Sequence, residues 1–141
     1  MNYDIIPTLA SEKAVERHED KEAWMTFSRR TARNPFLKEY LRIRENDRCA
    51  WCNRTYPLYG FHVHHTDYDH ECRYGKIINV PNPTEKRPER TAKVADCESC
   101  STNQPEYFQE CVSKLTTVHK TCNHTIEIVR GKLEDGTLIR R

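Results

Sequence analysis

The feature that most constrains this chain is the spacing of its seven cysteines. Cys49 and Cys52 form one Cys-x-x-Cys pair, and Cys97 and Cys100 form a second. The segment from His119 to Cys122 has the same spacing, with histidine in the first place. In a reducing compartment such pairs are more often metal ligands than disulfides, because one tight turn offers two ligands to a tetrahedral zinc ion. We therefore expect structural Zn²⁺.

Two partitions of the ligands remain open. Seven cysteines and one histidine supply eight ligands, which is the complement of two four-coordinate sites. The outer and inner sites of the two-zinc partition would be Cys49, Cys52, His119 and Cys122, and Cys72, Cys97, Cys100 and Cys111. The competing partition is one all-cysteine site made from the two Cys-x-x-Cys pairs. We favour two zinc ions, since each can contribute about 10 kcal/mol to folding.

The composition explains why zinc would be needed. Of the 141 residues only 36% are hydrophobic and 31% are charged, which indicates one domain with a thin apolar core. No secretory leader pattern opens the chain, and no apolar run approaches the roughly 20 residues that span a bilayer. We expect a soluble cytoplasmic (intracellular) protein with no membrane partner. The net charge of +2 is too small to indicate a polyanionic partner by itself.

Helices are expected before the first cysteine pair. Residues 9–31 form a polar pattern with a partial apolar stripe, which predicts a helix. Asn34-Pro35 is a strong start signal for a second helix that reaches about Arg44.

Two later segments are expected to be irregular or extended. Residues 73–93 contain three prolines and are predicted to be a long loop. In the last segment, residues 128–141, an Asp135-Gly136 turn between short apolar runs predicts a β-hairpin.

Basic residues gather in residues 29–48 and again in the predicted loop 73–93. Such local excess suits contacts with phosphate groups, although a solvated helix face would look the same. The candidate DNA-contacting residues are Arg29, Arg30, Arg33, Arg42, Lys86, Arg87 and Arg90.

A histidine doublet ends an alternating apolar and polar run, residues 59–70, that is typical of a short strand. Adjacent strand residues project to opposite sides, so His64 and His65 can have different functions, one binding a metal ion and the other accepting a proton. The alternative is a chance pair in a histidine-rich chain.

These residues resemble the HNH nucleases, whose ββα-metal core is a β-hairpin and a helix around one divalent ion, often bracketed by zinc knuckles. In that family a knuckle precedes a strand that ends in Asp-His or His-His, as in the segment VHHTDY at 63–68. The resemblance implies that His64 binds the catalytic metal ion and that His65 is the general base.

The segment from Ser113 to Asn123 is similar to the family's second strand, second knuckle and helix start. It implies that Asn123 is a metal ligand. Lys114 stands where the family has its middle asparagine, so the hydrogen bonds of that asparagine must come from elsewhere or be absent. Glu127, one helical turn after Asn123, would bind the metal ion or be a solvated helix residue. A second register takes Cys97-Cys100 as the last knuckle and fits less well, since serine then follows the knuckle.

The expected fold class is therefore α+β: a small zinc-stapled ββα-metal core with N-terminal helices and a C-terminal β-hairpin. Residues 1–48 would be a helical, basic, DNA-contacting region, 49–127 the nuclease core with an insertion at about 73–111, and 128–141 the hairpin.

The resemblance implies metal-dependent hydrolysis of phosphodiester bonds in double-stranded DNA, by a restriction nuclease or one from a phage or mobile element. It would act at the nucleoid or in a phage-infected cell. Mg²⁺ or Mn²⁺ suits the catalytic site, and one imidazole ligand also admits Ni²⁺, Co²⁺ or Zn²⁺. A homodimer is the simplest arrangement for cutting both strands at a palindrome.

Two other functions explain part of the sequence. A non-catalytic zinc-ribbon module that binds nucleic acid accounts for the knuckles and the basic segments, but not for the histidine doublet and Asn123. A zinc-stapled protein-interaction domain accounts for the nearly balanced charge and for the acidic residues 16–22.

Overall fold

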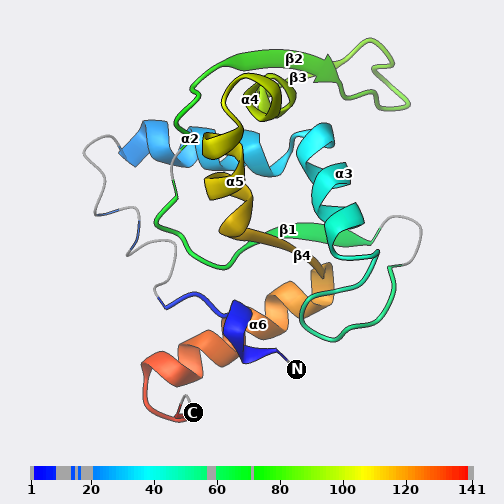
Figure 1. Cartoon of the computed structure of the whole chain (residues 1–141). Coiled ribbons are helices and arrows are strands. Elements are labelled where there is room, and N and C mark those ends of the chain that lie inside the picture. Colours follow the sequence, from blue (N-terminus) through cyan, green and yellow to red (C-terminus); the bar gives the residue numbers. More distant parts are fainter. Residues whose placement is uncertain are drawn as a thin grey trace.

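The computed structural model describes residues 2–8, 14, 16, 21–56, 60–70 and 72–139, apart from the side chains of Ala23 and Phe27. The described chain has mixed α+β structure with two small antiparallel sheets, each of two strands (Figure 1). The expected α+β class is confirmed at this level. The first half of the helix predicted for residues 9–31 lies largely outside the described residues, and its second half is α2 (Lys21–Ala32).

Two paired strands and the helix that follows the second one, α6, form a strand–strand–helix unit (Figure 1). Strand β1 (Phe61–His65) pairs antiparallel with β4 (Leu115–His119), so that Phe61 lies opposite His119 and His65 opposite Leu115. Helix α6 (Lys120–Glu134) begins directly after β4. The first strand was predicted from the alternating pattern around the histidine doublet, and the second was implied by the resemblance of the segment from Ser113 to Asn123.

Helix α3 (Pro35–Arg44) begins where the sequence predicts it. The Asn34 side chain accepts a hydrogen bond of 3.0 Å from the backbone N–H of Leu37, and proline occupies the first turn. The apolar face is fully buried at Leu37 and Leu41. The amide of Asn34 also donates to the carbonyl of Ala95, which ties the start of α3 to a strand 61 residues away.

The prediction of a long loop for residues 73–93 is wrong, because two strands lie at its ends. Strand β2 (Ile77–Pro81) pairs antiparallel with β3 (Thr91–Ala95), and residues 82–90 connect them. Burial alternates along β2 and along the first four residues of β3. The two strands were missed because their pairing is non-local and because the prolines nearby are typical of loops. Pro81 stands at the strand's last position, where proline is tolerated.

Helices α4 (Cys97–Asn103) and α5 (Pro105–Ser113) follow β3 and lead into β4. The Asp96 side chain accepts a hydrogen bond of 3.3 Å from the backbone N–H of Ser99 and so caps α4. The second Cys-x-x-Cys pair therefore lies on the first turn of a helix. Within the described residues, no helix has both the length and the apolar character needed to cross a lipid bilayer.

The predicted C-terminal β-hairpin is also wrong, because α6 continues through the first half of that segment, to Glu134. Ile126 is buried and Val129 and Leu133 are half-buried, a helical spacing that packs one face of α6 onto the core. Gly136 has φ 83° and follows the last turn, so the Asp135-Gly136 pair ends a helix instead of reversing a strand.

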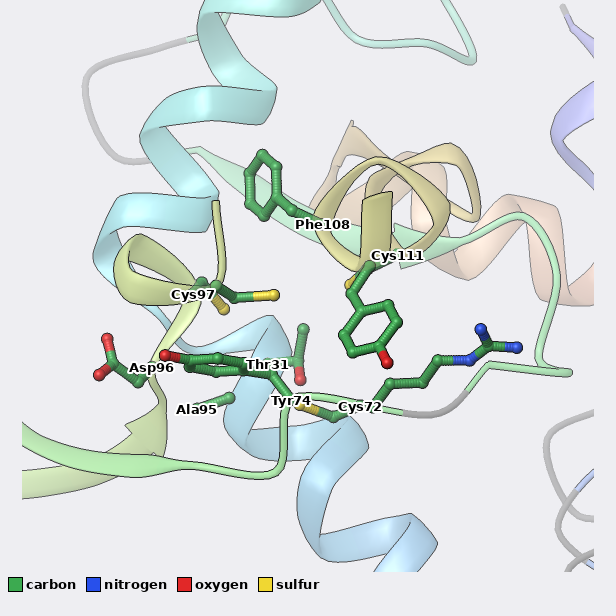
Figure 2. Close-up of a pocket in the computed structure, with 11 residues that line it drawn as sticks. Thr31, Cys72, Tyr74, Ala95, Asp96, Cys97, Phe108 and Cys111 are labelled. Carbon is green, nitrogen blue, oxygen red and sulfur yellow. The ribbon is translucent and has the colours of Figure 1, made fainter. Parts of the chain in front are cut away.

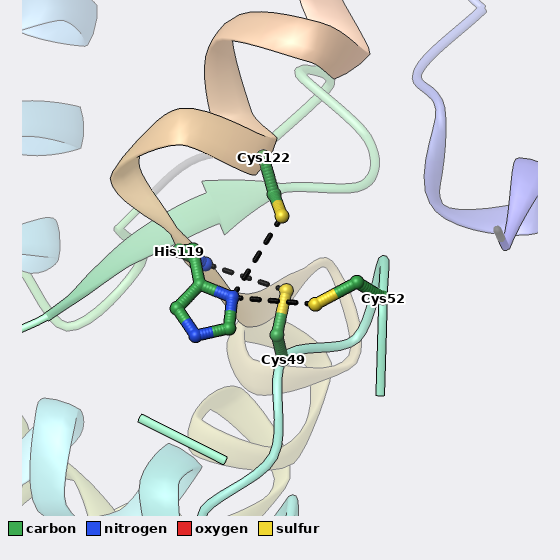
Figure 3. Close-up of side chains that lie close together, drawn as sticks. All are labelled: Cys49, Cys52, His119 and Cys122. Atoms are coloured by element: carbon green, nitrogen blue, oxygen red, sulfur yellow. Dashed lines mark hydrogen bonds between the residues drawn. The ribbon is translucent and has the colours of Figure 1, made fainter. Parts of the chain in front are cut away.

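The core consists of two hydrophobic clusters. The upper cluster joins α3, α4, α5 and β4 and contains Cys97 and Cys100. The lower cluster joins the first cysteine pair, β4, α6 and the short 3₁₀ helix η1 (Tyr3–Ile5), and contains Cys49. Strand β4 belongs to both, through Leu115 above and Val118 below. The remaining cysteines flank the same two clusters, so each half of the molecule has its own set of thiols (Figures 2 and 3).

Candidate metal centre

Four side chains of the lower half converge at the junction of β4 and α6 (Figure 3). Their ligand atoms all lie within 4.8 Å of one another, and they belong to Cys49, Cys52, His119 and Cys122. This is the outer site of the two-zinc partition. The competing all-cysteine site is not assembled, because Cys97 and Cys100 lie in the other hydrophobic cluster.

The backbone around the first pair forms a tight knuckle. The N–H of Cys49 donates to the carbonyl of Arg54 at 2.9 Å, and the N–H of Asn53 donates to the carbonyl of Cys49 at 2.8 Å. Asn53 has φ 63°, a left-handed conformation that asparagine tolerates better than most residues. The turn therefore presents Cys49 and Cys52 toward the same point.

The imidazole of His119 is oriented as a metal ligand should be. Its Nε2 lies 3.0 Å from the carbonyl oxygen of Thr55, which can only accept, so Nε2 carries the proton. The lone pair of Nδ1 then faces the sulfur atoms of Cys52 at 3.3 Å and Cys122 at 3.7 Å. Three thiolates and one imidazole are a common zinc ligand set, so this group could hold a structural zinc ion.

Two thiols of this group, those of Cys52 and Cys122, differ in pKa. Burial acts to raise the pKa of Cys52, but hydrogen bonds from the backbone of Arg54 and from the neighbouring side chains outweigh it and lower the pKa to about 7. Burial and the nearby Cys49 raise the pKa of Cys122 to about 12. One thiolate is therefore tolerated here at neutral pH, and a cation is needed to stabilise more.

A second pair of predicted ligands lies beside this group. His64 on β1 is buried, and its Nδ1 lies 3.2 Å from Oδ1 of Asn123 in the first turn of α6. Its Nε2 lies 2.8 Å from the carbonyl oxygen of Ile5. Burial lowers the pKa of His64, so the ring is neutral and carries one N–H. Because the carbonyl oxygen of Ile5 can only accept a hydrogen bond, the ring proton lies on Nε2. The lone pair of Nδ1 then faces Asn123.

His65 lies on the opposite face of β1. Its Nε2 is 3.3 Å from Oγ of Ser28 and 3.2 Å from Nδ1 of His70, and its ring stacks on Tyr68 at 5.0 Å. Burial, with the nearby His70 and His64, lowers the pKa of His65 to about 3. The structure thus brings His64 and Asn123 together, whereas His65 belongs to a separate group of polar side chains.

The sequence left open whether Glu127 binds a metal ion and what Lys114 does in place of an asparagine. Glu127 lies one turn after Asn123, near enough for its charge to act on His64, and it also pairs with Arg130 at 3.3 Å. The Lys114 ammonium donates to the carbonyl of Asp69, and its own carbonyl accepts from Thr66 at 2.9 Å. Lys114 therefore holds the loop after β1 against the start of β4.

The other four cysteines surround a small cavity in the upper half (Figure 2). They are Cys72, Cys97, Cys100 and Cys111. Burial and the neighbouring thiols raise the pKa of Cys97 and bring that of Cys111 to about 12. Among the described residues only the lower group has all its ligand atoms within 4.8 Å, so the upper sulfur atoms stand further apart.

The predicted DNA-contacting residues differ in exposure. Arg29 and Arg33 at the end of α2 are exposed, as is the whole 82–90 connection with Lys86, Arg87 and Arg90. Arg30 is half-buried. Arg42 is held by Glu39 at 2.6 Å and by Asp47, and these carboxylates raise its pKa. Its charge is already compensated within the protein.

Sequence reasoning missed three partners of the histidine doublet: Ser28, His70 and the carbonyl of Ile5. His70 ends the same polar run as the doublet, so its recurrence after five residues was a usable signal. A backbone carbonyl has no sequence signature, and Ile5 therefore could not be found. Comparison of the chain with protein-family models, with curated protein sequences and with solved structures found no match.

Proposed function

We propose that this protein is a metal-dependent DNA endonuclease of the HNH type. The observation that carries the proposal is the pairing of His64 with Asn123 across the β1–β4–α6 unit, directly beside a cysteine–histidine group. Strand, strand and helix follow in the order of that nuclease core, and the two side chains stand at the positions of its metal ligands.

The hydrogen-bond chemistry of His64 supports a cation at this point. With the proton on Nε2, the Nδ1 lone pair faces an amide oxygen at 3.2 Å, and two acceptors facing each other repel. A cation between the two atoms would remove the repulsion, because both the ring nitrogen and the amide oxygen could bind it. Rotation of the Asn123 amide would also remove it, by placing an N–H group opposite the ring nitrogen. Donation of the second ring nitrogen to a backbone carbonyl is the usual support of a metal-bound histidine.

The chain's own groups would divide the reaction as follows. A divalent ion, when bound, stabilises charge on the phosphate and on the leaving oxygen. His64 and Asn123 would hold it, with the carboxylate of Glu127 close by. His65 is neutral at physiological pH and can accept a proton from water, but a pKa of about 3 is low for a general base, which works best near the ambient pH.

The proposed substrate is double-stranded DNA. The exposed cations of the 82–90 connection and of the end of α2 would contact its phosphates. Replacing one phosphate-contacting cation lowers the salt dependence of binding by about one unit of the log–log slope. We expect this for Arg87→Ala and not for Arg42→Ala, because Arg42 is already paired.

The rival function is a zinc module that binds nucleic acid without cutting it. Two observations favour it: the carbonyl of Ile5 covers one side of His64, and His65 is only 8% exposed. Under this reading the histidines are buried structural groups.

Nicking of supercoiled plasmid with Mg²⁺ or Mn²⁺ tests the proposal. His64→Ala and Asn123→Ala should abolish nicking, while His62→Ala and His124→Ala, exposed neighbours on the same two elements, should retain it. Zinc content and circular dichroism must be equal in all four variants. A folded wild-type protein that binds DNA but nicks under neither metal supports the rival, and one that does not bind DNA supports the protein-interaction domain.

A separate variant decides the role of His65. Loss of a general base lowers the rate by about 10²–10⁴-fold. A folded His65→Ala protein that nicks at the wild-type rate would remove the base assignment and leave the metal site standing.

A further inference from the structure

Four thiols of the upper half come from three separate elements. Cys97 and Cys100 lie on the first turn of α4, Cys111 lies near the end of α5, and Cys72 lies in the irregular segment between β1 and β2. All four are free thiols. Three elements that are distant in sequence therefore bring soft metal ligands to one place, and none of these residues belongs to the group around His119.

The thiols surround a cavity of about 20 Å³. A cavity of this size holds about one water-sized body. Seven other residues complete its wall (Figure 2): Thr31, Arg73, Tyr74, Ala95, Asp96, Tyr107 and Phe108. Space for one small body beside four cysteine sulfur atoms suits a single soft cation.

The sulfur atoms must move closer together to become ligands, because no three of them lie within 4.8 Å of one another. Zinc–sulfur bonds of about 2.3 Å place the sulfur atoms of a tetrahedral site about 3.8 Å apart. In the upper half the four sulfur atoms do not all lie within 4.8 Å of one another. Three of the residues are on packed helices, but Cys72 is on an irregular segment whose backbone can adapt. A zinc ion at this place would therefore be bound after rotation of the cysteine side chains and a shift of the segment that carries Cys72.

A histidine supports this group from outside. Nε2 of His70 lies 3.0 Å from the sulfur atom of Cys111, and Nδ1 of His70 lies 3.2 Å from Nε2 of His65. When Cys111 is a thiolate, it can only accept, so His70 donates from Nε2 and accepts on Nδ1 from the ring of His65. Such a donor to a ligand atom is typical of metal sites, and it fixes the ligand's orientation.

We propose that Cys72, Cys97, Cys100 and Cys111 form a second zinc site, which joins α4, α5 and the segment after β1 around the upper cavity. His70 is a positioning residue for Cys111. None of the four proposed ligands is a residue assigned to phosphate cleavage, and His70 is the one member of the site that contacts such a residue, His65.

The first experiment uses the wild-type protein. Purified under reducing conditions, it should contain two zinc ions per chain by elemental analysis. After replacement of zinc by ¹¹³Cd²⁺, the NMR spectrum should show two signals, one for four sulfur ligands and one for three sulfur ligands and a nitrogen. One metal ion per chain with a single signal would overturn the proposal, as would a disulfide found between any two of the four cysteines by mass spectrometry without reduction.

Two variants assign the signals. Cys72→Ser should remove the four-sulfur signal and one zinc ion, and Thr102→Ala, an exposed position on α4, should remove neither. Cys72 is chosen because it lies outside the helices, so its loss should leave the β1–β4–α6 unit folded. If Cys72→Ser does not fold, the wild-type count and spectrum still decide. Retention of both signals in a folded Cys72→Ser protein contradicts the proposed ligand set.

Discussion

The two halves of the molecule use the same Cys-x-x-Cys spacing on different local structures. In the lower half Cys49 and Cys52 lie on a turn closed by left-handed Asn53, whereas in the upper half Cys97 and Cys100 lie on the first turn of α4. The lower ligand atoms already lie within 4.8 Å of one another, and the upper sulfur atoms surround a cavity.

The two groups differ because different structural elements carry their second pair of ligands. His119 and Cys122 flank the direct junction of β4 and α6, so paired strands and a helix hold both in place. The upper half receives Cys72 from an irregular segment and Cys111 from another helix. A shared spacing therefore supplies two ligands in either setting, and the tertiary structure decides whether the other two are already in position.

The largest expected effect is loss of the lower group. Cys49→Ser removes a buried ligand from a site that can contribute about 10 kcal/mol, comparable with the whole stability of a small domain. We expect this variant to be unfolded at 25 °C, as judged by circular dichroism and amide NMR signals. Cys72→Ser should keep the amide signals of β1, β4 and α6. The reverse order of severity would show that the upper group dominates folding.

Core truncations should separate the two clusters. Leu115→Ala in the upper cluster and Ile126→Ala in the lower one each remove a buried side chain, which costs about 2–5 kcal/mol of unfolding free energy. Chemical denaturation measures the loss. In the cadmium-loaded protein, Leu115→Ala should shift the four-sulfur signal more than the other, and Ile126→Ala should do the opposite. Equal shifts of both signals in both variants would mean that the clusters respond as one unit.

The contact of His70 with Cys111 predicts a smaller, local effect. His70→Phe removes the donor to the sulfur atom and should weaken zinc binding at the upper site by about 10–100-fold, as is typical for such support residues. Competition with a chromophoric chelator measures this affinity. The exposed His62→Phe serves as the matched control, and unchanged affinity in His70→Phe would remove the positioning role.

Acidification should distinguish the sites by the order in which they release zinc. Zinc must displace protons from thiols, so a thiol with a higher pKa lets protons compete up to a higher pH. Burial raises the pKa values of three of the four upper thiols, Cys97, Cys100 and Cys111. In the lower site burial raises that of Cys122 to about 12, but hydrogen bonding lowers that of Cys52 to about 7. As the pH falls, the upper site should therefore lose its ion first, which a zinc indicator follows together with the ¹¹³Cd signals. Earlier release from the lower site would contradict this.

Elements whose signals are local could be predicted in both halves of the molecule. Asn34-Pro35 fixes the start of α3 through a cap and a first-turn proline, and the alternation before the histidine doublet predicts β1. The two residue pairs of the lower metal group were identified from spacing alone. Each of these inferences depends on neighbours within a few residues.

The errors arose where distant segments decide the outcome. Strand β2 exists because β3 pairs with it, and Asp135-Gly136 ends a helix because α6 packs its apolar face on the lower cluster. Alternation alone predicted that His64 and His65 point to opposite sides, but not that Asn123 lies on one side and Ser28 on the other.

The sequence by itself determined the supply of metal ligands, the mixed α+β class and the strand that carries the histidine doublet, since periodicity and spacing are properties of the chain. The tertiary structure decided which cysteines share a site, which histidine meets Asn123 and how deeply each ring is buried. These depend on contacts between residues up to about seventy positions apart, which are fixed by packing and not by local preference.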